Sequence, residues 1–435
     1  MSLEFIGALG IAVLLLLFLI KVPVSISLII VGTVGYGLIR GFETGLVQLG
    51  NTPFATASSY ALSVIPLFIL MGMLLSFSNF GRDLFRAVDA WIGHFRGGMA
   101  LTTIGTSAIF SSISGSVNAT TASMARVTLP EMRHYNYSPT LSTACVAAGG
   151  TLGILIPPSV ILILYGVLTM EPIDQLLVAG LIPGVVQMLL FMGVVYLWVK
   201  KDPEAGPPSQ RSPWIEKFKS LSKVWPFLLL FIVSIGGIYL GVFTPTEAGA
   251  IGSFGALMLA LVTRRLDFKT LKQALGETTR LSAMIFLILI GADIFSQFLA
   301  ISTIPAQVTQ FVEGLGWHPI LIMGAILLVY FVLGLFLEGI AILVLTLPVI
   351  HPLVTGLGFD GVWFGVIMVM VMNMGLITPP LGISVYIISG VVKDIPIERI
   401  FKGVVPMLLA MVAAIVIFLI FPELVTILPE LMRSG

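Results

Sequence analysis

Two short segments of the sequence place consecutive prolines and a glycine within apolar surroundings. They read Gly-Ile-Leu-Ile-Pro-Pro-Ser at 153–159 and Gly-Leu-Ile-Thr-Pro-Pro-Leu at 375–381, so the offset is 222 (375 minus 153). Consecutive prolines remove two backbone donors and release carbonyls of the preceding turn, and a membrane interior cannot satisfy those carbonyls. The motif predicts an interrupted membrane helix rather than a simple kink. Its main-chain oxygens suit a desolvated Na⁺, and its free N–H groups suit a carboxylate.

A run of short hydrogen-bonding side chains precedes the first proline pair. Residues 114–120 read Ser-Gly-Ser-Val-Asn-Ala-Thr and interrupt the apolar stretch 98–130. Such a tip can approach the break at 149–159 closely and present oxygens, although Gly and Ser also favour plain helix packing. The polar side chains of these segments and of their second-half counterparts are the predicted substrate contacts: Ser114, Asn118, Thr120, Thr151, Ser159, Asn373 and Thr378.

Two carboxylates lie within apolar stretches of the second half. Glu338 interrupts the stretch 319–350, and Asp293 lies in the run 281–300, one helical turn before Gln297. A carboxylate at membrane depth is unfavourable unless it is paired or hydrated. We predict an ion-linked or structural role for Glu338. For Asp293 we predict a buried, hydrogen-bonded group rather than a substrate ligand.

The composition is that of a membrane protein. Of 435 residues, 57% are hydrophobic and 10% charged, and the mean hydropathy is +1.09; a soluble domain carries far more charge. The net charge of +1 gives no basic field for nucleic acid, and the single cysteine, Cys145, allows no intrachain disulfide. The sequence holds no Walker A or HExxH motif and no paired nucleophile and base, so we expect neither an enzyme nor an organic cofactor.

Windows of about 20 apolar residues predict ten full spans. The stretches 98–130 and 319–350 are each long enough for two helices but are broken in the middle, and we predict that both are re-entrant hairpins. The alternative is that each is a pair of tight spans or one long span. The predicted full spans are 5–20, 24–40, 60–78, 140–168, 176–199, 224–242, 246–263, 281–300, 361–390 and 400–421.

The distribution of basic residues supports this topology. With the N-terminus outside and both hairpins re-entrant, only Arg40 and Arg433 lie outside, so 20 of the 22 Lys and Arg residues (22 minus 2) lie inside. This satisfies the positive-inside rule, and it excludes a single full crossing by either hairpin but not a pair of spans. We predict a multi-pass protein of the bacterial inner membrane with both termini in the periplasm.

The two halves repeat each other. Besides the proline pairs, Thr-Leu-Pro at 128–130 matches 346–348, and Gly-Leu-Ile-Pro at 180–183 matches Gly-Val-Val-Pro at 403–406. By the topology above the halves are inverted, as in many secondary transporters. The predicted fold is an all-α polytopic membrane protein with inverted repeats, two re-entrant hairpins and two broken helices. The predicted division is 1–97 (scaffold and an amphipathic arm helix), 98–168 (first half of the transport domain), 169–300 (scaffold and loop 200–223), 301–318 (second arm helix), 319–390 (second half of the transport domain) and 391–435 (C-terminal span and tail).

The motif set resembles the large membrane subunit of tripartite ATP-independent periplasmic (TRAP) transporters. The resemblance covers essentially the whole chain and is carried by Gly-Gly-Thr-Leu-Gly-Ile-Leu-Ile-Pro-Pro-Ser at 149–159, Thr-Pro-Thr-Glu-Ala-Gly-Ala at 244–250 and Asn-Met-Gly-Leu-Ile-Thr-Pro-Pro-Leu-Gly at 373–382. It implies an elevator mechanism and Na⁺-coupled uptake of organic acids such as C4-dicarboxylates or sialic acid. It also implies two partners, a small four-span membrane subunit (here expected as a separate chain) and a periplasmic substrate-binding protein.

The resemblance further implies two Na⁺ sites. The first would use Ser114, Gly115 and Ser116 with the stretch containing Gly150, Gly153 and Pro157; the second would use Gly339, Gly375, Thr378 and Pro379. The alternative function is a stand-alone ion-coupled carboxylate carrier or exchanger that needs no binding protein.

Overall fold

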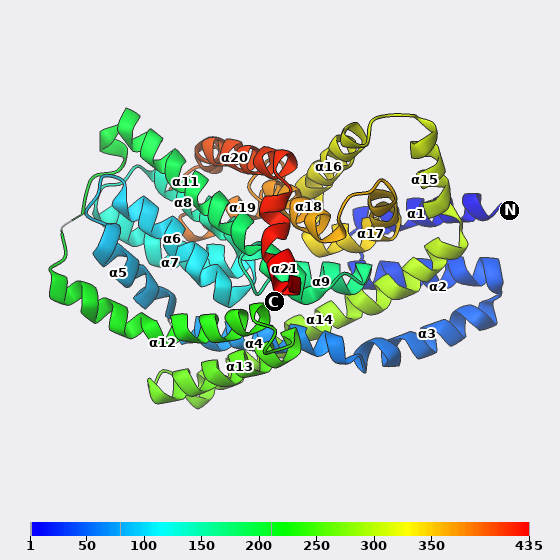
Figure 1. Ribbon diagram of the computed structural model, residues 1–435, viewed down its shortest axis with the longest axis horizontal. Coiled ribbons are helices and arrows are strands. Elements are labelled where there is room, and N and C mark those ends of the chain that lie inside the picture. The colour runs from blue at the N-terminus through cyan, green and yellow to red at the C-terminus, as the bar shows by residue number, and fades with distance from the viewer. Residues whose placement is uncertain (1, 79, 210, 435) are drawn as a thin grey trace.

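The computed structural model describes residues 2–78, 80–209 and 211–434, and in these ranges all regular structure is helical (Figure 1). Eight helices in this part of the chain are long and apolar enough to cross a membrane, and α1, α2, α9 and α18 are shorter apolar helices. The helices of the first half are α1 (Leu3–Leu19), α2 (Val24–Arg40), α3 (Phe42–Ala57), α4 (Val64–Phe77), α5 (Phe80–Ile92), α6 (Gly98–Ser114), α7 (Val117–His134), α8 (Pro139–Thr151), α9 (Val160–Thr169), α10 (Ile173–Ala179) and α11 (Leu181–Lys201). Those of the second half are α12 (Trp214–Tyr239), α13 (Pro245–Val262), α14 (Phe268–Ile301), α15 (Ile304–Gly314), α16 (Pro319–Phe336), α17 (Gly339–Gly356), α18 (Gly361–Gly375), α19 (Ile383–Val391), α20 (Ile397–Ile420) and α21 (Glu423–Ser434).

One layer consists of α2, α3, α4, α12, α13 and α14. Helix α14 packs against α2, α3 and α4, and α13 packs against α4 and α12. This layer runs along the lower edge of Figure 1. Glycines bring the backbones together: a Cβ on Gly32 would lie 2.8 Å from the backbone nitrogen of Phe295, and one on Gly291 would lie 2.8 Å from the Ser25 carbonyl oxygen. Small residues allow this close approach of membrane helices.

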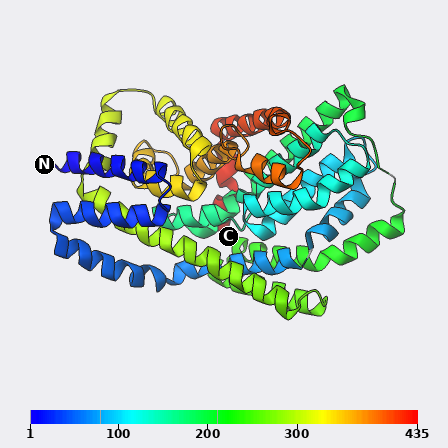
Figure 2. The ribbon, with the colours of Figure 1, turned by 180° about the vertical axis from the view of Figure 1, so that it is seen from behind.

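The second layer contains both hairpins and both broken helices, as predicted. The hairpins are α6–α7 and α16–α17, and the broken helices are α8–α9 and α18–α19. Figure 2 shows the two hairpins in opposite halves of this layer. The tips of both hairpins line one cavity together with residues of both helix breaks. Two helix pairs that cross the membrane fully would place their turns at its surfaces, so this meeting of the tips favours the re-entrant arrangement.

Several elements differ from the predictions. Helices α3 and α21 were not predicted, because their sequences mix polar with apolar residues. Helices α12 and α14 extend beyond the predicted spans 224–242 and 281–300 into polar sequence, since an apolar window detects only the part of a helix within the hydrocarbon. Helix α11, predicted with the scaffold, packs against α6, α8 and α20 of the second layer. The division into moving and stationary parts stays a prediction.

The segment between α11 and α12 joins the two layers. In the described residues, three of its main-chain hydrogen bonds reach segments other than α11 and α12. Gly97 N–H donates to the Gly206 carbonyl (2.9 Å), Ser138 N–H to the Ala205 carbonyl (2.9 Å), and Ser209 N–H to the Gly93 carbonyl (3.2 Å). Ala205 is buried. This linker therefore connects the end of α5 to the start of α8.

Candidate functional site

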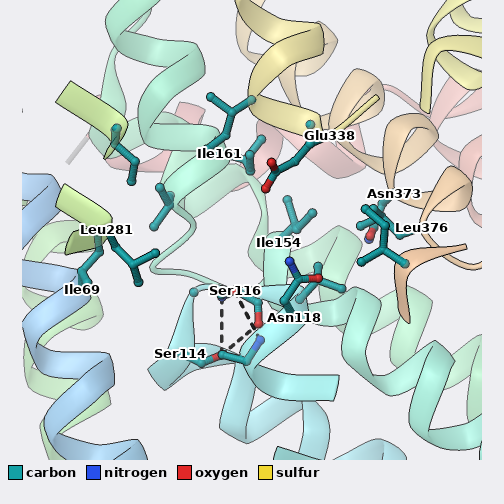
Figure 3. Close-up of a pocket in the computed structure, with 18 of the residues that line it drawn as sticks. Ile69, Ser114, Ser116, Asn118, Ile154, Ile161, Leu281, Glu338, Asn373 and Leu376 are labelled. Atoms are coloured by element: carbon teal, nitrogen blue, oxygen red, sulfur yellow. Dashed lines mark hydrogen bonds between the residues drawn. The ribbon is translucent and has the colours of Figure 1, made fainter. Parts of the chain in front are cut away.

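A cavity of about 330 Å³ lies where the two hairpin tips meet the two helix breaks. Figure 3 shows Ser114, Ser116 and Asn118 of the first tip facing Glu338 of the second. Ile154 and Asn373 contribute from the breaks. The opposite wall is apolar and belongs to the other layer, with Ile69 and Met73 on α4 and Leu281, Met284 and Ile285 on α14.

Four helices begin at this cavity. The first residues of α7 (Val117), α9 (Val160), α17 (Gly339) and α19 (Ile383) all line it. The N-terminal turn of a helix carries unpaired N–H groups and the positive end of the helix dipole. Four such ends around one cavity suit an anion without a basic side chain, whereas the Glu338 carboxylate in the same lining opposes one.

The first hairpin tip is held by hydrogen bonds within itself. Helix α6 ends at Gly115, whose φ of 56° is left-handed. The Ser114 and Thr120 hydroxyls are 2.6 Å apart, and the Ser116 hydroxyl accepts from the Ala119 N–H (3.4 Å) as the N-cap of α7. These contacts hold the tip without any contribution from a ligand.

Glycines let the tips press against the breaks. A Cβ on Gly115 would lie 2.6 Å from the Pro158 carbonyl oxygen, and one on Gly153 would lie 3.1 Å from the Ser116 carbonyl oxygen. In the second half, a Cβ on Gly375 would collide with the carbonyl of Gly334 in α16. Each hairpin thus meets its break with no side chain between the backbones at these points.

Both breaks are closed by local caps. The Ser159 hydroxyl accepts from the Leu162 N–H (3.3 Å) at the start of α9, and the Thr378 hydroxyl donates to the Met374 carbonyl (2.6 Å) at the end of α18. The peptide bond between the two prolines is cis in both copies.

A hydrogen bond joins the two breaks. The Asn373 side-chain amide donates to the Thr151 carbonyl (2.5 Å), and the Gln187 amide donates to the Thr151 hydroxyl (3.3 Å). Because a carbonyl only accepts, the nitrogen of the Asn373 amide must face Thr151. Asn373 Oδ1 is buried and has no hydrogen-bond partner in the described part of the chain. The side chain therefore offers an oxygen to whatever binds beside it.

Comparison with known proteins identifies this architecture. The model of the family described as "Tripartite ATP-independent periplasmic transporter, DctM component" matches residues 11–424. The chain belongs to this family.

Three relatives of this DctM-family chain are named after three different substrates. It is 31% identical over 410 residues to the sialic acid TRAP transporter large permease protein SiaM of Vibrio cholerae (94% of this chain, 95% of SiaM). It is 32% identical over 380 residues to the C4-dicarboxylate TRAP transporter large permease protein DctM of Pseudomonas aeruginosa (87% and 88%). The isethionate TRAP transporter permease protein DctMQ of Oleidesulfovibrio alaskensis is 32% identical over 413 residues; the match covers 94% of this chain but only 64% of DctMQ.

A solved structure supports the fold. The Alcanivorax borkumensis YdaH transporter, described as having an unusual topology, superposes with a TM-score of 0.61, covering 88% of this chain and 89% of YdaH. At 14% identity this likeness concerns the fold alone.

The predicted site residues of this DctM-family chain fall into two groups. Those that line the cavity are Ser114, Gly115, Ser116, Asn118, Glu338, Gly339 and Asn373. The others are not among the lining residues and lie in the caps, the breaks and the tip's own hydrogen bonds: Thr120, Gly150, Thr151, Gly153, Pro157, Ser159, Gly375, Thr378 and Pro379. The apolar wall from α4 and α14 could not be predicted, because its residues have the same hydropathy as other residues of a membrane span.

The two carboxylates occupy different places. Glu338 is exposed to the cavity, and its carboxylate forms no hydrogen bond within the described residues (Figure 3). Asp293 lies in a second cavity, of about 370 Å³, between α14, α3, α9 and α17. Asp293 accepts from the Gln297 amide (3.1 Å) as expected, but its side chain is exposed rather than buried.

Proposed function

We propose that this DctM-family permease couples Na⁺ entry to the uptake of an organic carboxylate across the bacterial inner membrane. A periplasmic binding protein delivers the substrate, and a small four-span subunit on a separate chain completes the membrane complex. The observation that supports this most directly is the cavity in which both hairpin tips meet both broken helices.

The cavity's chemistry suits a carboxylate. Four helix N-termini supply N–H groups and positive dipole ends, while Ser114, Asn118 and Asn373 supply hydrogen-bonding side chains. The apolar wall from α4 and α14 excludes water from one side. A small acid with a short polar or apolar body fits this combination.

Carbonyl-rich segments beside the cavity suit Na⁺. In the first half, Ser114, Gly115 and Ser116 lie against the break that contains Gly153 and Pro157. In the second half, Gly339 lines the cavity, and Gly375, Thr378 and Pro379 form the break behind it. The cation binds first in this proposal, because it neutralises carbonyl and hydroxyl oxygens that would otherwise repel the substrate anion.

The ion gradients are sufficient for accumulation. A charge crossing roughly 100 mV gains about 2.3 kcal/mol, and a tenfold Na⁺ gradient adds roughly 1.4 kcal/mol per ion. Two Na⁺ would supply about 7 kcal/mol, of which a monoanion returns about 2.3. The remaining roughly 5 kcal/mol supports accumulation of several thousandfold.

An elevator movement along α14 accounts for the two cavities. One face of α14 supplies Leu281 and Ile285 to the first cavity, and further along it supplies Ala292 and Ser296 to the second. Leu281 and Ala292 are 11 residues apart (292 minus 281), and so are Ile285 and Ser296 (296 minus 285). This separation is about 16 Å along a helix. The first cavity lies toward the N-terminal end of α14, which carries most of the basic residues of 264–280, so we assign this conformation to the cytoplasm-facing state.

Uptake into proteoliposomes tests the proposal. The chain is reconstituted with the small subunit, and uptake of a labelled carboxylate is measured with an inward Na⁺ gradient, with K⁺ in place of Na⁺, and with or without the binding protein. We expect uptake only when Na⁺ and the binding protein are both present. Uptake that is equal without the binding protein would instead support the stand-alone carrier, and uptake that is equal in K⁺ would exclude Na⁺ coupling.

A further inference from the structure

Lys217 is a buried cation at the junction of α5 and α12. Its side chain is only 5% exposed, although it lies in a segment of otherwise exposed residues. Its ammonium lies over two indole rings, 5.6 Å from the centroid of Trp91 and 5.0 Å from that of Trp214. Phe218 completes the aromatic cluster, with its ring 6.1 Å from Trp91 and 6.4 Å from Trp214.

This ammonium has no anionic partner in the part of the chain that the structure describes. Across the described residues, none of the ion pairs or side-chain hydrogen bonds involves Lys217 Nζ. Glu216, its neighbour in sequence, is exposed. Indole faces attract a cation, but they cannot accept the three N–H bonds that an ammonium makes in water. Most of the lysine is enclosed, but its Nζ is not among the fully enclosed polar atoms of the described residues, so an anion from outside the chain can reach it and supply the missing partner.

The depth of Lys217 indicates the source of that anion. Helix α12 has 26 residues, about 39 Å in length, against a hydrocarbon thickness of about 30 Å. Its apolar part begins near Val224, and Lys217 lies seven residues earlier, about 10 Å outside that boundary. This is the level of lipid headgroups, and Trp214 (62% exposed) and Phe218 (60% exposed) present the aromatic surface typical of that level.

We propose that Lys217 and the cluster of Trp91, Trp214 and Phe218 bind the phosphate of an anionic phospholipid, such as phosphatidylglycerol. The exposed Lys223 on the same helix adds to the attraction. The lipid's acyl chains would lie along the exposed apolar residues of α12, beginning with Trp225 and Leu229. The bound lipid would fill the corner where α5 meets α12.

Native mass spectrometry of the full chain in nanodiscs tests this. Nanodiscs contain phosphatidylcholine with increasing fractions of phosphatidylglycerol, and the retained lipids are counted. We expect the wild type to retain phosphatidylglycerol in preference to phosphatidylcholine, and Lys217→Gln to weaken that retention about fivefold. Lys219→Gln removes the same charge from an exposed position and should have little effect.

Three outcomes would overturn the proposal. These are unchanged phosphatidylglycerol retention in Lys217→Gln, an equal loss in Lys219→Gln, and equal retention of both lipids by the wild type. Should Lys217→Gln fail to fold, Lys217→Arg and Trp214→Leu replace it. The first keeps the charge and must keep the lipid, and the second removes part of the cluster and must weaken retention.

Discussion

The Asn373 side-chain amide donates a hydrogen bond to the carbonyl of Thr151, which is the equivalent residue of the other repeat. Thr151 and Asn373 are 222 residues apart, the same offset as the two proline pairs, and the donor and acceptor atoms are 2.5 Å apart. The two breaks therefore cross at the point about which the repeats are related.

Asn373→Asp tests the importance of this crossing. The aspartate is nearly isosteric, but its ionised carboxylate cannot donate to the Thr151 carbonyl and would be buried against it. Leaving a buried acceptor unpaired costs about 1–3 kcal/mol, so we expect uptake into proteoliposomes to fall about tenfold or more. Asn136→Asp, the same change at an exposed residue, should leave uptake intact. Equal uptake by both variants would contradict a role for the crossing.

Gly375→Ala tests the close approach of the second hairpin to its break. The added methyl group would collide with the Gly334 carbonyl, and overpacking of this kind costs about 1–3 kcal/mol. We expect lower thermal stability and little uptake, as we do for the bulkier Gly375→Leu. Gly390 lies on α19 with no atom within 4 Å of an added Cβ. Gly390→Ala should behave like the wild type, and a matching defect there would show that the effect is not local.

Ser116→Ala should abolish Na⁺-dependent uptake while leaving membrane insertion intact. The change removes the hydroxyl that caps α7 and an oxygen from the cavity lining. Thr244→Ala also removes a helix cap, that of α13 in the other layer, at a cost of about 1 kcal/mol. Measuring uptake against Na⁺ concentration separates the two: Thr244→Ala should lower the melting temperature without shifting the Na⁺ dependence. An unchanged Na⁺ dependence in Ser116→Ala would remove that residue from the site.

Cross-linking tests movement along α14. Cys145 is the only cysteine, so Cys145→Ala provides a cysteine-free background. Ile340 on α17 and Ile285 on α14 line the same cavity, and a short bifunctional reagent should join cysteines at these positions in this conformation. A displacement of about 16 Å would bring position 340 to the level of Ser296, so the 340–296 pair should react in the opposite state. Failure of the second pair under all ion and substrate conditions would count against the elevator movement.

Asp89 on α5 predicts a pH dependence of stability. Burial, with the nearby Glu131 carboxylate, raises the pKa of the Asp89 carboxyl to about 6. Between the ordinary pKa near 4 and this value the folded protein binds more protons than the unfolded chain, so stability falls as the pH rises through this window. Asp89→Asn should flatten this dependence and raise the melting temperature at neutral pH. Asp83→Asn should lower it, because Asp83 pairs with Arg265 at 2.5 Å; a lower melting temperature in both variants would contradict the assignment.

The sequence predicted the breaks and the hairpins more accurately than the ends of the helices. Proline pairs and the Ser-Gly-Ser tip interrupt a helix through local backbone chemistry, so their effect can be predicted from the residues themselves. The wall formed by Leu281 and Ile285 could not be predicted, because a leucine that lines a cavity has the same hydropathy as one that faces lipid. The bond between Asn373 and Thr151 depends on how the two repeats cross, which neither repeat encodes alone.

The linker between α11 and α12 touches its neighbours through peptide groups alone in the three bonds described above. Such bonds are indifferent to side-chain identity but sensitive to the number of residues between them. Apart from the buried Ala205 and from Gly206, where a Cβ would lie 2.9 Å from Val199 Cγ2, the segment should tolerate a change of side chain better than a change of length. A tag or insertion here would act at a distance, by loosening the start of α8.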